Sequence, residues 1–424
     1  MEALPVELCQ EILRLLPLRE LKSTRLVSRS LAALGSEYLI QSEFLVLPHR
    51  DDCMRLLAIS RHATLASHVE RVTFDMGEVD EYHARHNVYF VLLYMRDPED
   101  RIEGSSAAQE LYRHCSHLKH TFAPNYCAQA LLSEAFGNLH RLSAIDINLS
   151  RCPFNDEVWQ RIWKIPTTRS FPRVETMERF KRILSAAAAA AASSPSSQRI
   201  HSLSHDRLPL EFWAQDPPQD LDPICQVFGG LQTLSLGSDS KSLAQREASL
   251  AGLGRCLRQT PYLRTLILSF TNLRTTSESL LSFSAWRGDD SVWKHLHTLV
   301  LQGVGIDVDE FATFLARHSA SLRRLQLGES NQNKPDLLWA RSRWLMFHSR
   351  DDKVLCQHLR HTMKLDKFNL QDYAAAEVDS EPLYDDDWNR IGHETLVAAR
   401  LEEFVVHGGP WPIDLDDKVI SSPT

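Results

Sequence analysis

A short apolar pattern recurs along this chain and constrains its fold more than any other feature. In four close copies leucine occupies the first, fourth and sixth positions, and these copies begin at Leu231, Leu263, Leu296 and Leu322. Their starts are 32, 33 and 26 residues apart. A period of this length indicates stacked structural units that bury their apolar faces against their neighbours.

Within each copy one residue separates the last two leucines, which is the spacing of side chains on one face of a β-strand. The pattern therefore predicts a short strand, and the first leucine anchors the turn that leads into it. Looser copies begin at Val69 and Leu139, and a degenerate copy begins at Leu118. The residues between the last two leucines are predicted to face outward, and they are Ser235, Ile267, Val300 and Gln326.

The segments between the close copies have the apolar spacing of amphipathic helices. Helices are predicted over 246–259, 277–286 and 309–318, with Asp307 or Asp309 as the N-cap of the last one. Helices and short parallel strands thus alternate, which makes the predicted fold class α/β. The alternation resembles an irregular leucine-rich-repeat solenoid, although the spacing lies at or slightly above the usual period of about 20–29 residues.

The solenoid-like region is expected to extend over 69–410, after a helical junction over 41–68 and before a flexible tail over 411–424. A low-complexity Ala/Ser/Pro stretch near 186–200 is expected to be a disordered insertion in a solenoid loop. Its alanines nevertheless favour the extension of a helix that begins near Val174.

The repeat signal weakens beyond the last close copy. Helices are predicted over 335–347 and 353–363, and one more strand is predicted over 401–406. Between them, residues 376–390 have the composition of an acidic loop.

The first 40 residues carry more apolar surface than so short a segment can bury by itself. Helical spacing relates the apolar residues Leu4, Leu8, Ile12, Leu15 and Leu16. Pro5 suits a first helical turn, and Pro17 ends the helix. A second apolar set follows before Gly35, so two or three short helices are predicted, with leucines that point in several directions.

This N-terminal segment resembles an F-box. The elements of that family occur in order: Leu-Pro-x-Glu-Leu from Leu4, Ile-Leu from Ile12, a leucine before the proline of the turn, Leu21, and Arg-Leu-Val-Ser-Arg from Arg25. The resemblance covers about residues 2–40 and implies a three-helix domain, assigned here to residues 1–40. The whole chain resembles F-box substrate receptors with an irregular solenoid, fungal ones in particular.

The resemblance implies a substrate-recognition subunit of a ubiquitin ligase of the Skp–cullin–F-box type. The F-box would dock on the Skp-type adaptor, and the repeat region would bind an unidentified protein substrate near the ubiquitin-loaded enzyme. Such a protein is not an enzyme, and no cofactor is expected. Because a few residues dominate most interfaces, the candidate adaptor-binding residues are Leu4, Pro5, Ile12, Leu13, Leu16, Leu21 and Val27.

Charge and cysteine usage exclude several other classes. The net charge of −8 argues against general nucleic-acid binding, which needs a basic face. No apolar run approaches the roughly 20 residues that span a bilayer, and the acidic start lacks the pattern of a signal peptide. The eight cysteines form no Cys-x-x-Cys pair, which indicates reduced thiols in an intracellular protein, cytoplasmic or nuclear.

Motifs of common enzymes are absent from the sequence. It contains no phosphate-binding glycine loop, no Gly-x-Ser-x-Gly elbow and no His-Glu-x-x-His pair. Histidine and cysteine gather over 114–120 and over 356–361, but no second pair of ligands stands at a fitting distance from either group. We therefore predict no metal site and assign no catalytic residue.

Two alternative interpretations remain open at this level. In the first, the protein is a non-catalytic repeat scaffold whose N-terminal helices cap the solenoid, because repeat arrays need capping units. In the second, it is an enzyme with an active site dispersed over an α/β fold. A cap hides its leucines inside the chain, whereas an adaptor-binding domain presents them to solvent.

Overall fold

The computed structural model describes most of the chain in two compact units. The described residues are 4–39, 42–79, 98–154, 160, 163, 169–193, 200–214, 221–239, 245–271, 293–328, 345–347, 352–370, 373–375 and 399–411. Residues 1–204 form the N-terminal unit, and residues 205–424 form the C-terminal unit. We describe each unit by itself.

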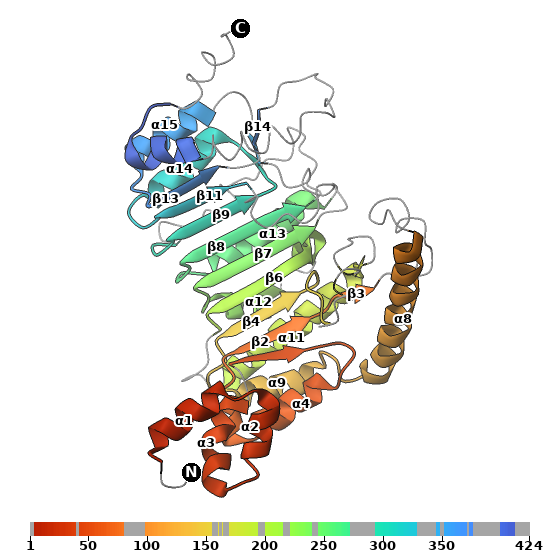
Figure 1. The fold of residues 1–424 in the computed structure, drawn as a ribbon. Coiled ribbons are helices and arrows are strands. Elements are labelled where there is room, and N and C mark those ends of the chain that lie inside the picture. The colour runs from red at the N-terminus through yellow and green to blue at the C-terminus, as the bar shows by residue number, and fades with distance from the viewer. Residues whose placement is uncertain are drawn as a thin grey trace, which may run out of the picture. The chain divides into compact units, whose positions relative to one another are not determined.

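The N-terminal unit begins with three short helices and continues as an α/β fold (Figure 1). Its helices are α1 (Val6–Leu15), α2 (Leu18–Thr24), α3 (Arg29–Leu39), α4 (Asp52–Ser60), α5 (Ala63–Ala66), α8 (Pro98–Phe122), α9 (Gln129–Asn138) and α11 (Arg173–Ser193). Its strands are β1 (Glu43–Val46), β2 (Arg71–Asp75), β3 (Glu78–Val79), β4 (Ala144–Asn148) and β5 (Arg169–Ser170). Strand β6 (Ser202–Pro209) crosses the boundary between the units.

Strands β1, β2 and β4 pair in parallel in that order, so that equivalent residues stand in rows. One inward row joins Phe44, Val72 and Ile145, and the next joins Val46, Phe74 and Ile147. All six side chains are buried. The predicted strands at Val69 and Leu139 are therefore confirmed, and β1 is an additional strand that the leucine pattern did not reveal.

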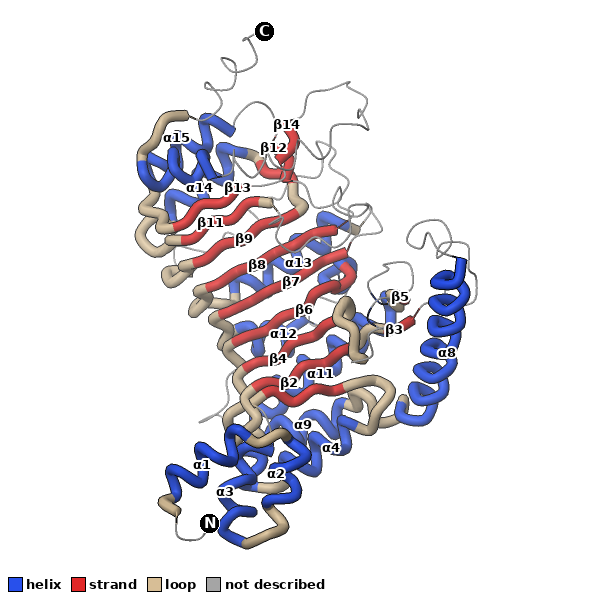
Figure 2. The backbone as a smooth tube through the Cα atoms, in the orientation of Figure 1, coloured by secondary structure: helices blue, strands red, loops and turns tan. Residues whose placement is uncertain are grey.

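The C-terminal unit repeats this arrangement with more strands (Figure 2). Its strands are β7 (Thr233–Asp239), β8 (Thr265–Thr271), β9 (Thr298–Gln302), β10 (Gly305–Ile306), β11 (Arg324–Leu327), β12 (Leu345–Phe347), β13 (Lys367–Leu370) and β14 (Tyr373–Ala375). Its helices are η2 (Leu210–Ala214), α12 (Asp222–Phe228), α13 (Arg246–Arg258), α14 (Val308–Arg317), α15 (Asp352–Thr362) and the π-helical turn η8 (Glu403–His407).

Strands β7, β8, β9, β11 and β13 pair in parallel, and the leucine pattern sets their register. One inward row joins Leu234, Leu266, Leu299, Leu325 and Phe368, and a second joins Leu236, Leu268, Leu301, Leu327 and Leu370. Both rows are buried. The anchoring leucines that begin the four close copies are also buried, which confirms the predicted role of the pattern.

Helices fill the predicted places between these strands. Helix α13 matches the prediction over 246–259, α14 matches 309–318, and α15 matches 353–363. The Asp307 carboxylate caps α14 by accepting a 2.8 Å hydrogen bond from the Glu310 amide. The predicted helix over 277–286 and the acidic loop over 376–390 lie outside the described residues.

Several predictions of local structure are wrong. The degenerate copy at Leu118 lies in helix α8, because Leu118 and Phe122 have the spacing of one helical face as well as that of a loose strand copy. The segment 401–406 is helical and not a strand, and Phe404 and Val405 are buried there. Of the helix predicted over 335–347, the described residues Leu345–Phe347 form strand β12.

The alanine run departs from the predicted disorder. Helix α11 continues through the alanines to Ser193, and it packs against α9. Four of the alanines are buried, namely Ala186, Ala187, Ala188 and Ala190. Small side chains let a helix approach its neighbours closely, so this part of the 186–200 stretch belongs to the packed structure, whereas 194–199 lie outside the described residues.

Candidate adaptor-binding surface

Helices α1 to α3 enclose a small core of their own. It contains Leu13, Leu21 and Leu31, which are at most 5 % exposed, and the partly buried Leu16, Leu34 and Tyr38 surround it. Proline precedes both α1 and α2, where a missing amide hydrogen costs nothing. Arg25 crosses α3 at Gly35, and its Nε atom donates a 3.3 Å hydrogen bond to the Ala32 carbonyl. The three helices therefore hold one another without the strands.

A row of apolar side chains on α1 faces solvent. Leu4, Leu8, Ile12 and Leu15 succeed one another at three- or four-residue spacing and lie on one helical face. Leu15 is 81 % exposed. In the turn before α3, Leu26 and Val27 are 89 % and 69 % exposed. We call these six residues the N-terminal apolar surface. Large apolar side chains that remain exposed in such a short segment mark an interaction site.

The structure divides the seven predicted adaptor-binding residues into two groups. Leu4, Pro5, Ile12 and Val27 are exposed, and Leu16 is half-buried. Leu13 and Leu21 are each 1 % exposed and fill the three-helix core, so they position the surface and do not form part of it. Leu8, Leu15 and Leu26 are exposed residues that the prediction left out. The helical spacing of Leu8 and Leu15 with Ile12 was the sequence signal for two of them.

The outward row of the C-terminal strands is a second candidate surface. It joins Ser235, Ile267, Val300, Gln326 and Asn369, all of them partly exposed. The four residues predicted to face outward are thus in register with one another. A row of threonines, Thr233, Thr265 and Thr298, lies two positions earlier on the same side. On β7, β8 and β9 these two rows carry only apolar and hydroxyl side chains, whereas Arg324 on β11 and Lys367 on β13 continue the threonine row.

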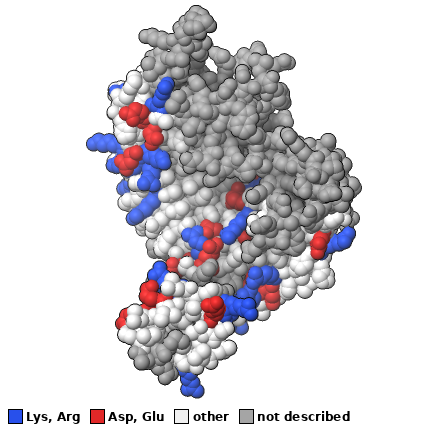
Figure 3. Space-filling model, viewed as in Figure 1, with Lys and Arg blue, Asp and Glu red and all other residues white. Residues whose placement is uncertain are grey.

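The outward face of the N-terminal strands is charged instead. Arg71 on β2 pairs with Asp146 on β4, and the Thr73 hydroxyl donates a 2.6 Å hydrogen bond to Glu43 on β1. Arg151, which follows β4, lies 3.9 Å from both Glu43 and Asp75. Acidic and basic side chains accordingly lie side by side on the molecular surface (Figure 3).

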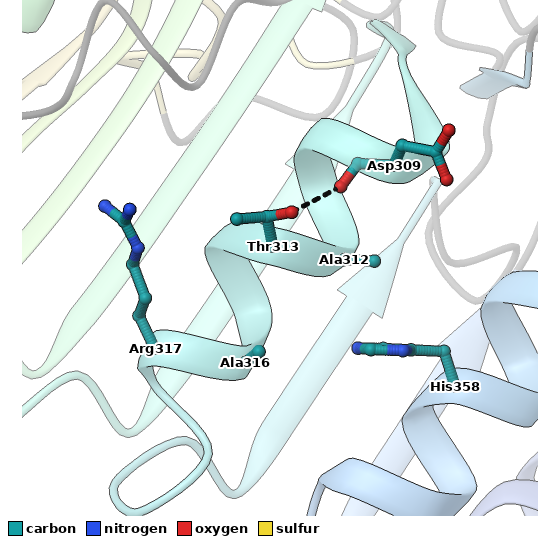
Figure 4. Close-up of a pocket in the computed structure, with 6 residues that line it drawn as sticks. All are labelled: Asp309, Ala312, Thr313, Ala316, Arg317 and His358. Carbon is teal, nitrogen blue, oxygen red and sulfur yellow. Dashed lines mark hydrogen bonds between the residues drawn. The ribbon is translucent and has the colours of Figure 1, made fainter.

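A cleft of about 620 Å³ separates α14 from α15. Figure 4 shows the His358 ring pointing from α15 towards Ala312 and Ala316 of α14, while Asp309 and Arg317 lie at opposite ends of that helix segment. The Thr313 hydroxyl is occupied by a 2.9 Å hydrogen bond to the Asp309 carbonyl. The cleft is open, and its polar side chains are not arranged around a common point. It therefore offers no arrangement for acid–base or nucleophilic chemistry.

The two histidine-rich segments do not converge on a metal site within the described residues. No group of three histidine, cysteine or carboxylate side chains there could hold a metal ion. On α15, Cys356 is buried, His358 enters the cleft and His361 is exposed, so the three side chains point in different directions. Among the residues that the structure describes, no helix has the length and apolar character needed to cross a membrane.

Comparison with known proteins supports the N-terminal assignment. Residues 1–36 match the F-box domain family. A search of curated proteins found no match to the chain. The matched segment contains α1, α2, the core residues Leu13, Leu21 and Leu31, and the whole N-terminal apolar surface. An F-box domain supports association with a Skp-type adaptor and, through it, with a cullin ligase. Residues 1–36 are an F-box domain, and the chain is therefore an F-box protein.

Proposed function

We propose that this protein is a substrate receptor of a Skp–cullin–F-box ubiquitin ligase, and that the N-terminal apolar surface is its contact with the adaptor. The observation that carries the proposal is the exposure of six large apolar side chains on a domain that already has its own core. Full burial of one such side chain contributes about 1.5–3 kcal/mol. Transfer of these residues into an apolar groove would provide the main driving force for docking.

The contact can be tested with alanine variants on and off the N-terminal apolar surface. Leu15→Ala and Leu26→Ala remove exposed side chains from the surface, whereas Val6→Ala removes one that is 53 % exposed but lies off the Leu8–Ile12–Leu15 face. We expect a central surface variant to weaken binding of a purified Skp-type adaptor by about 2 kcal/mol, roughly 30-fold in Kd. Val6→Ala should bind within about threefold of the parent protein.

A core variant separates direct contact from positioning. Leu13→Ala should lower the stability of the three-helix domain because it opens a cavity beside Leu21 and Leu31. Its bound fraction should recover at low temperature or with excess adaptor, because both favour the folded domain. Equal binding by the parent protein and a Leu15→Ala, Leu26→Ala double variant, measured by isothermal calorimetry, would refute the proposed contact.

For the substrate, we propose the outward row of the C-terminal strands as the binding surface. Ile267 and Val300 stand next to each other in this row, and an apolar pair between polar neighbours is typical of the centre of an interface. Affinity purification with the proteasome blocked should recover a set of bound proteins. Ile267→Ser with Val300→Ser should deplete this set, and Asn369→Ser in the same row should retain it. The repeat region would then act as a solenoid receptor without chemistry of its own.

The alternative of a scaffold with an N-terminal cap predicts a different result. Removal of residues 1–40 from a capped array exposes the apolar end of the next unit, so the melting temperature falls and the protein aggregates. Removal of a separate F-box leaves the remaining α/β structure folded. We expect the truncated protein to stay monomeric in size-exclusion chromatography and to lose adaptor binding, because the three helices have their own core.

A further inference from the structure

Two cysteines from successive helices of the C-terminal unit meet side by side. Cys225 lies on α12 and Cys256 lies on α13, 31 residues later in the chain. Their sulfur atoms are 3.5 Å apart and share a hydrogen bond. A disulfide has a sulfur–sulfur distance of about 2.05 Å, so the two adjacent sulfur atoms must approach each other further to bond.

The surroundings of the two thiols assign them different roles. Cys225 is partly exposed, whereas Cys256 is buried at 0 % exposure. The hydrogen bond between the two sulfur atoms lowers the pKa of Cys225, and Arg255 acts in the same direction, although burial and Asp222 oppose the shift. The same hydrogen bond and burial raise the pKa of Cys256. The accessible sulfur is therefore the nucleophile, and the buried thiol stays protonated beside it.

Three other cysteines have a raised thiol pKa instead. Burial raises the pKa of Cys53 to about 11 and that of Cys115 to about 12. Burial also raises the pKa of Cys152, which is partly exposed like Cys225. Cys152 thus provides a matched comparison of similar accessibility and opposite electrostatic environment.

We propose that Cys225 and Cys256 are an oxidation site that forms a reversible disulfide with hydroperoxides and ties α12 to α13. The Cys225 thiolate attacks a peroxide oxygen, the O–O bond breaks, and Cys225 becomes a sulfenic acid while hydroxide takes up a proton to leave as water. The Cys256 sulfur then attacks the Cys225 sulfur, the S–O bond breaks, and the Cys256 proton leaves with the hydroxyl group as a second water. Two thiols lose two electrons, and one hydrogen peroxide becomes two waters.

The cross-link joins the helices of two neighbouring structural units. Helix α12 leads into β7 and helix α13 leads into β8, the strand that carries Ile267. A bond between the helices restricts the movement of the α12–β7 and α13–β8 repeats relative to each other in the folded protein. It also lowers the conformational entropy of the unfolded chain. This inference is independent of the proposed ligase function, since it concerns only the C-terminal unit.

The test uses the full-length reduced protein and hydrogen peroxide. After brief exposure and alkylation, peptide mass spectrometry should find a peptide pair linked through Cys225 and Cys256, and a dithiol should restore both thiols. Loss of the Cys225 thiol should be at least roughly tenfold faster than loss of the Cys152 thiol. The oxidised protein should melt several degrees higher than the reduced protein.

Single variants distinguish the two roles. Cys256→Ala should stop oxidation at Cys225 sulfenic acid, which dimedone traps, and Cys225→Ala should abolish the cross-link and leave Cys256 unmodified. The kinetics on the unsubstituted protein keep the test valid if a variant folds poorly. Absence of the linked peptide from folded protein, or equal peroxide rates for Cys225 and Cys152, overturns the proposal.

Discussion

The two units bury similar rows of apolar residues, but their outward faces differ. On the N-terminal strands the outward positions carry Glu43, Arg71 and Asp146; Arg71 pairs with Asp146, and Glu43 accepts a hydrogen bond from Thr73. On β7, β8 and β9 the corresponding positions carry threonine, serine, isoleucine and valine, and Arg324 and Lys367 continue the threonine row on β11 and β13. The inward rows give both units the same α/β fold. The charged outward side chains of the N-terminal strands have polar partners within their own unit, whereas the outward face of β7, β8 and β9 presents apolar side chains to a partner.

The helices α11 and α13 are also held by different kinds of contact. In the N-terminal unit a buried ion cluster fastens α11, with Arg179 donating a 3.0 Å hydrogen bond to Glu78 and pairing with Glu175. In the C-terminal unit α13 is held by close backbone approach, since a Cβ atom at Gly252 would lie 1.9 Å from the Trp213 carbonyl oxygen. An ionic contact holds α11 in the first unit and a close steric contact holds α13 in the second, and the following experiments test what each contributes.

The largest effect is expected from Arg179→Met. The Arg179 side chain is 6 % exposed and also lies over the Tyr126 ring, so its removal leaves the partly exposed Lys119, 2.9 Å away, as the remaining cationic partner of Glu78. We expect a loss of about 3–5 kcal/mol in the free energy of unfolding, measured by urea denaturation. The exposed Arg61–Glu134 pair is the control, and Arg61→Ala should cost less than about 1 kcal/mol.

The second test addresses packing in the C-terminal unit. Gly252→Ala should destabilise the protein by about 2–3 kcal/mol, because the added methyl group meets backbone that cannot move aside. Gly137→Ala in α9 of the N-terminal unit should be neutral or stabilise by up to about 1 kcal/mol, since nothing lies within 4 Å of the new methyl group. Equal losses in the two variants would show that close backbone approach does not distinguish the units.

Acid provides a third test. His49 is buried against Phe154, with ring centroids 4.9 Å apart, and burial lowers the pKa of His49 from 6.5 to about 4, assisted by Arg50 and His114. The unfolded chain then binds the proton more tightly than the folded chain, so stability present above pH 6.5 declines as the pH falls towards 4.

The variant His49→Gln should remove this dependence. Its free energy of unfolding should fall by about 2 kcal/mol less than that of the parent protein across the same pH range. His318 in the C-terminal unit is also buried, and its pKa is lowered to about 4, so acid sensitivity should not be confined to the charged unit. Hydrogen exchange at pH 7 and pH 5 can follow the two units separately.

The smallest effects are expected on the outward faces. Asp146→Asn should cost about 1 kcal/mol at low salt because Arg71 and Ser204 lose their charged acceptor, and the cost should shrink as salt rises. Ile267→Ser should cost a similar amount or less, independent of salt. A salt-dependent loss at Ile267 would contradict the assignment of an uncharged face.

Prediction from sequence succeeded where an apolar pattern was compatible with only one type of secondary structure. The leucines of the close copies anchor turns and fill the inward rows, and helices 246–259 and 309–318 lie where their apolar spacing placed them. It failed where spacing was ambiguous, as at Leu118, where residues four apart suit a helix, and at 401–406. There Arg360 stacks on Phe404 and donates hydrogen bonds to the carbonyls of Gly408 and Gly409, contacts invisible in the local sequence.

Sequence prediction also succeeded only in part for the candidate adaptor-binding surface. Family resemblance located the F-box at the N-terminal end of the chain. It treated Ile12 and Leu13 alike, although α1 exposes Ile12 to solvent and buries Leu13. The strands β1 and β13 were missed because each lacks the full leucine pattern and owes its place to pairing with β2 or β11.

The sequence by itself determined the α/β class and the positions of the repeated strands, because both depend on periodic apolar residues that act locally, and the family's motif identified the N-terminal domain. Only the tertiary structure decided which F-box leucines face solvent, that the alanine run is packed helix, and that Cys225 meets Cys256. These features depend on which surfaces meet after folding, and residues far apart in the chain carry no periodic signal of such meetings.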